Sequence, residues 1–456
     1  MVTVTRRCDS QSGKGAKVSA RGGKLIDGWL PTKVIIADFV DGLLITDLGV
    51  EISPEVGRLE VLVRRDGRPV GMVSLDVPEE PTALARDLVA AAAHLPAAVA
   101  APWPRDEPAA WPKVTVAIPT VFGRMEMLCL AVASLVRLDY PEFDIVLVDN
   151  RPIPREEDHA RVRGVAGFPI EILHEPERGI SAARNRALSQ TRDPYIAFTD
   201  DDVQVEPDWL RQIVRPFLDD ASVACVSGLV IPTELSSPEQ SQFEHFYGGF
   251  HRTFAPILHS GAHPDLSDPL FPYAPGRFGA GNNMAFRVSA LNELGGFDTS
   301  LGTGTPSRGG EDIASFIAIV LAGYSIAFEP SAVIHHSHRG TNEEFRHQVF
   351  SYGVGLAAMY TSLLMADRRH RRGILERLPN AVRLFVRSGN GTIQKSGSGV
   401  KAPALLRARQ AAGIVAGPAL YLRSRRQHPR SPHPLSPPWG DAATPPEARS
   451  RSLKKA

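Results

Sequence analysis

The chain has few cysteines, an almost balanced charge and no long apolar run, and each of these features excludes a class of protein. Its three cysteines, Cys8, Cys129 and Cys225, are scattered without metal-ligand spacing, so they predict neither a disulfide framework nor a zinc site. They fit a reducing cytoplasm. A formal net charge of +1 gives no general case for a nucleic-acid partner. Because no run of about 20 apolar residues occurs, no transmembrane helix is predicted, and the N-terminus lacks the apolar core of a signal peptide.

Composition divides the chain into six segments. Polar residues 1–24 are predicted to be disordered, and residues 25–96 to form a small α+β appendage without a derivable function. The appendage shows a hairpin signal at Asp66-Gly67 and a helix start at Pro81. The Ala/Pro-rich stretch 97–112 is typical of a linker. A large α/β domain at 113–340, a helical extension at 341–426 and a disordered basic, Pro-rich tail at 427–456 complete the prediction.

The segment 113–340 has the pattern of a mostly parallel sheet flanked by helices. Apolar runs predict strands at 114–120, 143–150, 170–174 and 195–200. Two helical patterns lie between them: one places Met127, Leu128 and Leu130 on its apolar face, and the other has Ser181 as its cap. Ligands of such folds bind beyond the carboxyl ends of the strands. Thr120, Asp149 and the acids at 200–202 fall at these ends, which predicts a site there.

Three consecutive acids, Asp200, Asp201 and Asp202, follow the buried run Tyr195–Phe198. Like charges repel, and a divalent cation bound to a phosphate would relieve the repulsion. Mg²⁺ and Mn²⁺ take oxygen ligands from one or two carboxylates together with substrate phosphates. Taken alone, the cluster also fits a solvated acidic turn.

A series of motifs in one order carries a resemblance to a known family. The motifs are Ala117-Ile118-Pro119-Thr120 with Arg124, Ile145-Val146-Leu147-Val148-Asp149-Asn150, Ala183-Arg184-Asn185, Phe198-Thr199-Asp200-Asp201-Asp202, Gly281-Asn282-Asn283-Met284-Ala285-Phe286-Arg287, Gly295-Gly296-Phe297-Asp298, Gly309-Gly310-Glu311-Asp312 and Val333-Ile334-His335-His336-Ser337-His338-Arg339. In this order they resemble a family 2 glycosyltransferase, which has the inverting GT-A fold and uses sugar nucleotides. The resemblance covers Val114 to Arg339, about half of the chain.

The resemblance implies a set of site residues. Asp149 would accept hydrogen bonds from the nucleobase and ribose, Arg184 would contact the diphosphate, and Asn283 would donate to sugar hydroxyls. The full set implied to contact the nucleotide sugar is Pro119, Thr120, Arg124, Asp149, Arg184, Asp200, Asp201 and Asn283. A divalent metal, Mg or Mn, would be held by Asp200, Asp202 and His336. In the cluster of His335, His336 and His338, the second histidine matches the family position best.

The pair Glu311-Asp312 is implied to carry the catalysis. An inverting transfer needs a base that takes the proton of the acceptor hydroxyl as its oxygen attacks the anomeric carbon. The resemblance assigns this base to Asp312 and leaves Glu311 to orient the acceptor or the sugar. Two acids after Gly309-Gly310 are also ordinary first-turn residues favoured by the helix dipole.

The sequence therefore predicts a metal-dependent inverting glycosyltransferase of the cytoplasm. Its partners would be a nucleoside-diphosphate sugar donor and a hydroxyl acceptor, a glycan or a lipid-linked molecule, in surface polysaccharide or glycolipid synthesis. The alternatives are a sugar-1-phosphate nucleotidyltransferase, whose Gly-rich phosphate loop is not evident at 120–124, and a catalytically degenerate scaffold.

Two apolar stretches near the C-terminus have two interpretations, one of which is contact with a membrane surface. Val354–Leu364 and Ala411–Leu422 are apolar, and Arg423, Arg425 and Arg426 follow the second. Such segments either lie on an anionic bilayer at the inner face of the membrane or pack against the protein core.

Overall fold

The computed structural model describes residues 29–45, 55–78, 80–104, 106–247, 253–262, 268–274, 276–388 and 402–428. The segments predicted to be disordered, 1–24 and nearly all of 427–456, lie outside these residues.

One half of the central sheet consists of parallel strands joined by helices. In chain order the elements are β5 (Val114–Thr120), α2 (Met125–Leu135), β6 (Phe143–Asp149), α3 (Glu156–Ala166), β7 (Ile170–His174), α4 (Ile180–Gln190) and β8 (Tyr195–Phe198). The strands lie in the order β7-β6-β5-β8, and each neighbouring pair is parallel. Their carboxyl ends therefore meet at one edge of the sheet, as the sequence predicts.

The other half of the sheet is mixed. It contains β9 (Val203–Val205), β10 (Val223–Pro232), β12 (Ile257–Ser260), β13 (Met284–Arg287) and β14 (Ser325–His336). β13 joins the halves by pairing antiparallel with both β8 and β10, and β10 is parallel to β14. The helices of this half are α5 (Trp209–Asp219), α7 (Val288–Glu293) and α8 (Glu311–Leu321). The predicted α/β class with helices on the sheet is confirmed, with β12 and β13 as antiparallel insertions.

The strands read as continuous apolar runs because both faces of the sheet are covered. All seven residues of β5 are buried. Phe198, Phe286 and Phe316 belong to a core on one face, while Ile118, Leu147 and Trp209 belong to the core on the other.

Of two local predictions about helices, one is partly wrong and the other is wrong. On α2, Leu128, Ala131 and Leu135 are buried as predicted, whereas Met127 and Leu130 are exposed. The cap of α4 is Gly179 with φ +140°, a value that favours glycine. Ser181 is the second residue of this helix and donates to the carbonyl of Leu301 at 2.8 Å.

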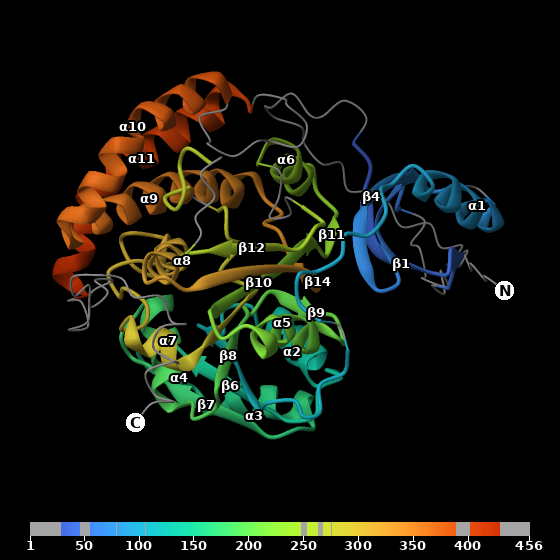
Figure 1. Cartoon of the computed structure of the whole chain (residues 1–456), viewed down its shortest axis with the longest axis horizontal. Coiled ribbons are helices and arrows are strands. Elements are labelled where there is room, and N and C mark those ends of the chain that lie inside the picture. Colours follow the sequence, from blue (N-terminus) through green and yellow to red (C-terminus); the bar gives the residue numbers. More distant parts are fainter. Residues whose placement is uncertain are drawn as a thin grey trace.

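The N-terminal appendage is a second sheet with one helix, and it lies at one side of the molecule (Figure 1). Its elements are β1 (Thr32–Val40), β2 (Leu43–Leu44), β3 (Arg58–Arg65), β4 (Arg68–Asp76) and α1 (Pro81–Ala92). The hairpin between β3 and β4 turns at Asp66 and Gly67, with φ of 51° and 72°, as the sequence predicts. The edge of β1 pairs with β11 (Glu234–Leu235) of the large domain.

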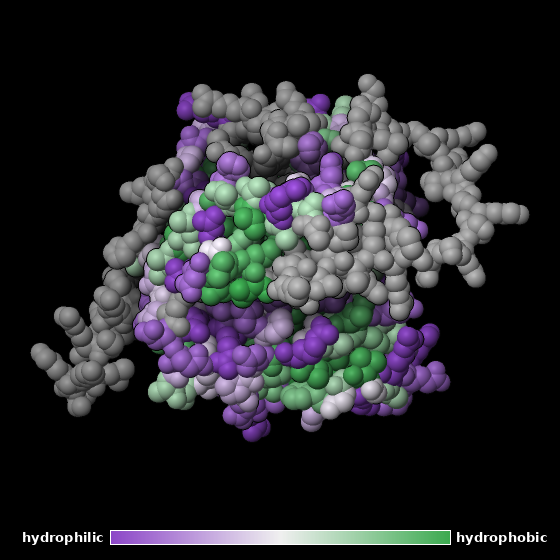
Figure 2. Space-filling view, turned by 90° about the vertical axis from the view of Figure 1, so that its right-hand side faces the viewer, coloured by the Kyte–Doolittle hydropathy of each residue, from purple (hydrophilic) through white to green (hydrophobic). Residues whose placement is uncertain are grey.

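The appendage and the following segment are attached to the large domain. Trp103, in the stretch predicted as a linker, is buried and donates from its indole to Glu329 at 2.8 Å. On the side of the molecule that carries the appendage, apolar and polar areas alternate over the surface (Figure 2).

Three long helices form the C-terminal extension: α9 (Asn342–Ala366), α10 (Arg368–Ser388) and α11 (Ala404–Gln427). They lie on the side away from the appendage, and α6 (Pro238–Tyr247) lies near the start of α9 (Figure 1). α9 and α11 approach at glycines: a Cβ on Gly353 would lie 2.2 Å from the carbonyl oxygen of Gln410, and one on Gly413 would lie 2.2 Å from that of Phe350. Only glycine permits such a close contact.

One helix in the described part of the chain, α9, has the length and apolar composition of a membrane span. Close to half (44%) of its apolar stretch is buried inside the fold, where Val349, Met359 and Leu363 are inaccessible to solvent. Core helices of soluble proteins meet the same length and composition criteria, so α9 by itself is weak evidence for a span.

Candidate functional site

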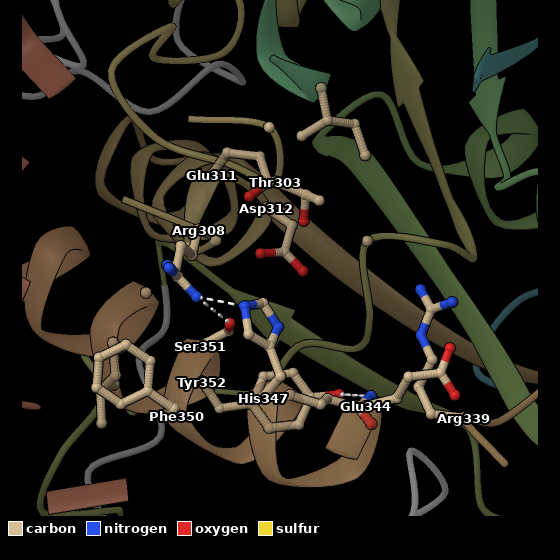
Figure 3. Close-up of a pocket in the computed structure, with 18 of the residues that line it drawn as sticks. Thr303, Arg308, Glu311, Asp312, Arg339, Glu344, His347, Phe350, Ser351 and Tyr352 are labelled. Atoms are coloured by element: carbon tan, nitrogen blue, oxygen red, sulfur yellow. Dashed lines mark hydrogen bonds between the residues drawn. The ribbon is translucent and has the colours of Figure 1, made fainter. Parts of the chain in front are cut away.

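A cavity of about 2040 Å³ opens between the large sheet and the C-terminal helices. Five of the residues singled out in the sequence line it: Arg184, Asp200, Glu311, Asp312 and His336. They come from α4, the turn after β8, the start of α8 and the end of β14. Figure 3 shows how the two acids at the start of α8 lie in this cavity. The structure thus brings Arg184 and His336, which are 152 positions apart in the chain, to one cavity.

The acidic turn after β8 is held by one arginine and one threonine. Arg124 donates from Nη1 to Asp202 at 2.8 Å and from Nη2 to Asp201 at 3.0 Å. The hydroxyl of Thr120 donates to Asp201 at 2.7 Å. Asp200 stays on the cavity side with its side chain 29% exposed. Thr120 and Arg124 therefore shape the turn, and their direct contact with a nucleotide stays a prediction.

The two outer acids of the turn have different electrostatic environments. Burial and the charges of Asp202 and Asp201 raise the pKa of Asp200 to about 6, although Arg184 acts in the opposite direction. Burial also acts to raise the pKa of Asp202, but the charge and hydrogen bond of His336, together with Arg124, outweigh it and hold this pKa below its ordinary value. A positive ion beside Asp200 would favour its charged form.

The three histidines at the end of β14 have different partners. His336 has its Nε2 3.5 Å from Asp202 Oδ2, which agrees with its selection from the sequence. His335 lies 2.8 Å from Glu206, and His338 lies 2.5 Å from Glu244. Of these three contacts, the one with His336 reaches the acidic turn.

Arg184 connects the acidic turn to the start of α8. Its side chain is 1% exposed, and it donates to Glu311 Oε1 at 2.8 Å and to the carbonyl of Gly281 at 2.9 Å. Its Nη2 is 3.5 Å from Asp200 Oδ1, while its Nε is buried without a partner. Both terminal nitrogens thus have protein acceptors. The diphosphate contact implied for Arg184 stays a prediction, and in this structure the residue orients two acids.

The adjacent acids at the start of α8 point in different directions (Figure 3). Glu311 is buried against Arg184, and burial, together with the negative charge of Asp312, raises the pKa of Glu311 to about 7. Asp312 is partly exposed and faces the cavity. A Cβ added at Gly281 would lie 2.8 Å from Asp312 Oδ2, so a glycine is needed there for the carboxylate to take this place.

Asp149 lies below a second, smaller hollow of about 500 Å³ at the ends of β5 and β6. It is fully buried and accepts hydrogen bonds from Arg151 at 2.7 and 2.9 Å, with His159 at 2.8 Å. The guanidinium of Arg151 lies 4.4 Å above the ring of Phe122, and both residues line the hollow. Asp149 thus places Arg151, which sequence reasoning did not single out, and its own contact with a nucleobase stays a prediction.

Asn283 does not face the cavity, and its implied contact with sugar hydroxyls is not supported by its position. It is fully buried, accepts from the indole of Trp209 at 2.9 Å, and donates to the carbonyls of Leu229 and Ala332 at 3.0 and 2.8 Å. All its amide atoms are used inside the core. Pro119 is likewise buried, within β5 and beside Val148 of β6.

The neighbouring Asn282 is the residue that sequence reasoning missed. It lines the cavity, is 6% exposed, and has a buried Oδ1 without a hydrogen-bond partner. A buried polar atom without a partner is unfavourable, and a ligand that donates a hydrogen bond would satisfy it. Both asparagines lie in the turn before β13, and two adjacent amides give no sequence signal for which of them faces the cavity.

A comparison with known families decides the class of this domain. Residues 115–295 match the model of "Glycosyl transferase family 2". These residues form a family 2 glycosyltransferase domain. The match confirms the family and enzyme class predicted from the sequence, and it includes the strands β5 to β8, the acidic turn and Asn282. Glu311, Asp312 and His336 follow the matched segment.

Two curated relatives of the family 2 domain are a glycosyltransferase and a succinoglycan biosynthesis protein. "Pre-mycofactocin glycosyltransferase" of Mycobacterium tuberculosis is 29% identical over 219 residues, which are 47% of this chain and 42% of the relative. "Succinoglycan biosynthesis protein ExoM" of Rhizobium meliloti is 29% identical over 209 residues, 44% of this chain and 60% of the relative. The chain thus spans about half the length of the curated relatives it matches.

A solved structure similar to this chain is a mannosyltransferase from Pyrobaculum calidifontis in complex with GDP-Man and Mn²⁺. The similarity covers 78% of this chain and 83% of that one, with 19% sequence identity and a TM-score of 0.40.

Proposed function

We propose that the family 2 domain transfers a sugar from a nucleoside-diphosphate donor to a hydroxyl group of an acceptor, with inversion at the anomeric carbon. The observation that carries this proposal is the placement of two acidic groups on one cavity. Asp200 lies at the end of the parallel strands and Asp312 lies at the start of α8. Such a cavity can hold a donor between a site for its diphosphate and a base.

Asp312 is the proposed base. The hydroxyl oxygen of the acceptor attacks the anomeric carbon while the bond from that carbon to the diphosphate oxygen breaks. Asp312 accepts the hydroxyl proton, and the nucleoside diphosphate leaves with the bonding electron pair. Glu311 is not available for this step, because it is buried and receives a hydrogen bond from Arg184 at 2.8 Å.

The residues of the acidic turn fit a divalent metal. Asp200 and Asp202 offer carboxylate oxygens, which are ligands of Mg²⁺ or Mn²⁺, and His336 offers an imidazole nitrogen beside Asp202. In the residues that the structure describes, no three His, Cys, Asp or Glu side chains are grouped to hold a metal ion alone. The proposed metal would take further oxygen ligands from the donor diphosphate. When bound there, the cation would neutralise the charge that develops on the leaving diphosphate.

Donor-dependent release of a nucleoside diphosphate by the purified chain tests the proposal. A panel of nucleotide sugars with Mn²⁺ or Mg²⁺ should contain at least one that is turned over, and Asp312→Asn should stop the turnover without loss of donor binding. If no donor of the panel binds to the wild-type chain, the proposal is rejected. Polysaccharide or glycolipid synthesis is the proposed setting, supported by the named functions of the relatives.

We also propose that the chain works at the cytoplasmic face of a membrane, attached peripherally through α10 and α11. α10 exposes Leu375, Leu378 and Val382, spaced to lie on one helix face. Arg371, Arg372 and Arg383 are exposed on the same helix, so it combines apolar and basic groups as interfacial helices do. Cosedimentation with vesicles tests this: Leu378→Asp should reduce binding to anionic vesicles, whereas equal sedimentation of both forms would refute the attachment.

A further inference from the structure

Cationic side chains of the C-terminal extension and of the loop before α8 line the same cavity as Asp312. Arg308 belongs to this loop, Arg346 to α9, and Arg409 and Arg423 to α11, and all four line the cavity. None of the four is ion-paired with a carboxylate in the part of the chain that the structure describes. Clustered arginines without acidic partners form a site for an anion.

Arg308 is the most constrained of these residues. Its backbone has φ of 61°, a left-handed conformation that is uncommon outside glycine. Such a conformation persists where the surroundings fix it. Its Nη1 donates to His347 Nε2 at 2.6 Å and lies 3.4 Å from the hydroxyl of Ser351, and its guanidinium lies 5.3 Å from the ring centre of Phe350. Three residues of α9 thus hold one end of this guanidinium.

The other end of the Arg308 guanidinium is available to a ligand. No hydrogen bond of its Nε or Nη2 occurs within the described residues. His347 accepts from Arg308 through Nε2, so a neutral His347 carries its proton on Nδ1 and has a second donor to offer. Arg308, His347 and Asp312 all line the same cavity, where Figure 3 shows their side chains. Donors for an anion and the proposed base therefore face one cavity.

Acidic residues also line the cavity. Glu343 and Glu344 lie in the first turn of α9, and Glu239 lies in α6. Glu344 is engaged with Thr341 in a capping box, where its Oε2 lies 2.7 Å from the hydroxyl. Its carboxylate therefore has a partner other than the arginines.

We propose that the acceptor carries an anionic group, a phosphate or a carboxylate, and that Arg308 binds this group next to the hydroxyl presented to Asp312. The proposal rests on the proposed function and names the chemical class of its acceptor. The forked guanidinium of arginine matches either anion with two parallel hydrogen bonds. The neutral part of the acceptor then extends toward α9 and α11, where Phe350, Tyr352 and Leu420 line the cavity.

Binding of three matched probes to the full chain tests the proposal. The probes are phenyl β-glucoside, its 6-phosphate and phenyl β-glucuronide, which differ only in the group at carbon 6: a neutral hydroxymethyl, a phosphate ester or a carboxylate. Their affinities are measured by ligand-observed NMR in EDTA, without donor or metal. At least one anionic probe should bind roughly tenfold more tightly than the neutral probe, the scale of one charge-assisted hydrogen bond. The stronger of the two anions identifies phosphate or carboxylate.

Variants of the chain test whether Arg308 causes the preference for anionic probes. Arg308→Gln should abolish the advantage of the anionic probe and leave the affinity of the neutral probe unchanged, whereas Arg308→Lys should retain part of it. Arg372→Gln, an exposed arginine of α10 far from the cavity lining, is the matched control. Equal binding of all three probes to the wild type, or an advantage that survives Arg308→Gln, would overturn the proposal. These measurements need no donor, so a failed donor panel would reject the proposed function independently.

Discussion

Arg184 donates to Glu311 at 2.8 Å, and this contact separates the roles of two adjacent acids. Glu311 is turned into the protein by the contact, and Asp312 is left to face the cavity. The same guanidinium reaches Asp200 at 3.5 Å. One buried arginine therefore links Asp200, the acid proposed to face the donor diphosphate, with the helix start that carries the proposed base.

The first prediction separates the two acids by their carboxylate chemistry. Asp312→Asn should lower turnover by roughly 10²- to 10⁴-fold, the usual contribution of a general base, with donor affinity near that of the wild type. Glu311→Gln keeps an acceptor for Arg184 and should retain most of the turnover. Steady-state rates and donor titration of both variants provide the measurement. A larger loss in Glu311→Gln than in Asp312→Asn would assign the base to Glu311.

The second prediction concerns the metal. Asp202→Ala should abolish metal-dependent donor binding, because the diphosphate loses its bridge to the turn. Isothermal titration with an active donor and Mn²⁺ measures the effect. Asp144→Ala, which removes an exposed carboxylate paired with Lys113 at 2.7 Å, is the control and should bind donor normally. Unchanged affinity in Asp202→Ala would refute the metal assignment.

The third prediction gives Asn283 a structural role. Asn283→Ala leaves the indole of Trp209 and two buried carbonyls without partners, so it should reduce the free energy of unfolding by about 2–4 kcal/mol. Urea denaturation measures the loss. Asn282→Ala should leave stability nearly unchanged and weaken donor binding instead, since its Oδ1 has no protein partner. The opposite pattern would return the sugar contact to Asn283.

The fourth prediction follows from Glu311 and pH. Its pKa is raised to about 7 in the folded chain, mainly by burial, and the ordinary value is 4.5. The folded state therefore binds the proton more tightly than the unfolded state. The contribution to stability is fully present below pH 4.5 and is lost as pH rises through 7. Without donor or metal, unfolding free energies at several pH values should decline over this interval in the wild type. In Glu311→Gln the decline should be smaller, and equal slopes would show that Glu311 does not titrate in this range.

Much of the fold was predictable because its strands are short apolar runs with clear ends. Residues 114–120 and 170–174 were predicted as strands with the observed bounds, and both faces of the sheet that surrounds them are covered. The helix α3 was not predicted, since its sequence Glu156–Ala166 is polar and buries only His159, Val162 and Ala166. α10 lies in the stretch 341–426 that was predicted as a helical extension, but its own bounds were not predicted, because its many arginines obscure a periodic apolar face.

The sequence predicted several residues of the candidate site, but it did not predict how their side chains are arranged. Asp200 and His336 reach one cavity because the carboxyl ends of β8 and β14 lie at the same edge of the sheet, and Asp312 joins them from the start of α8. The sequence could not show that Arg184 and Asn283 are committed to protein partners, since these partners come from remote elements such as α8 and β10. The cationic wall from α9 and α11 could not be foreseen either, because helix docking through Gly353 and Gly413 creates it.

The docking of α11 also links the completion of the cavity lining to the order in which the chain is synthesised. His428, at the end of this helix, accepts from Ser300 through its carbonyl at 3.0 Å and lies 3.2 Å from Glu177. α11 is the last helix in the described part of the chain, and it contacts the loops before α4 and α8, which are synthesised before it. Arg409 and Arg423 of α11 also line the cavity. If the acceptor binds where we propose, its binding site is complete only once α11 has been synthesised and docked.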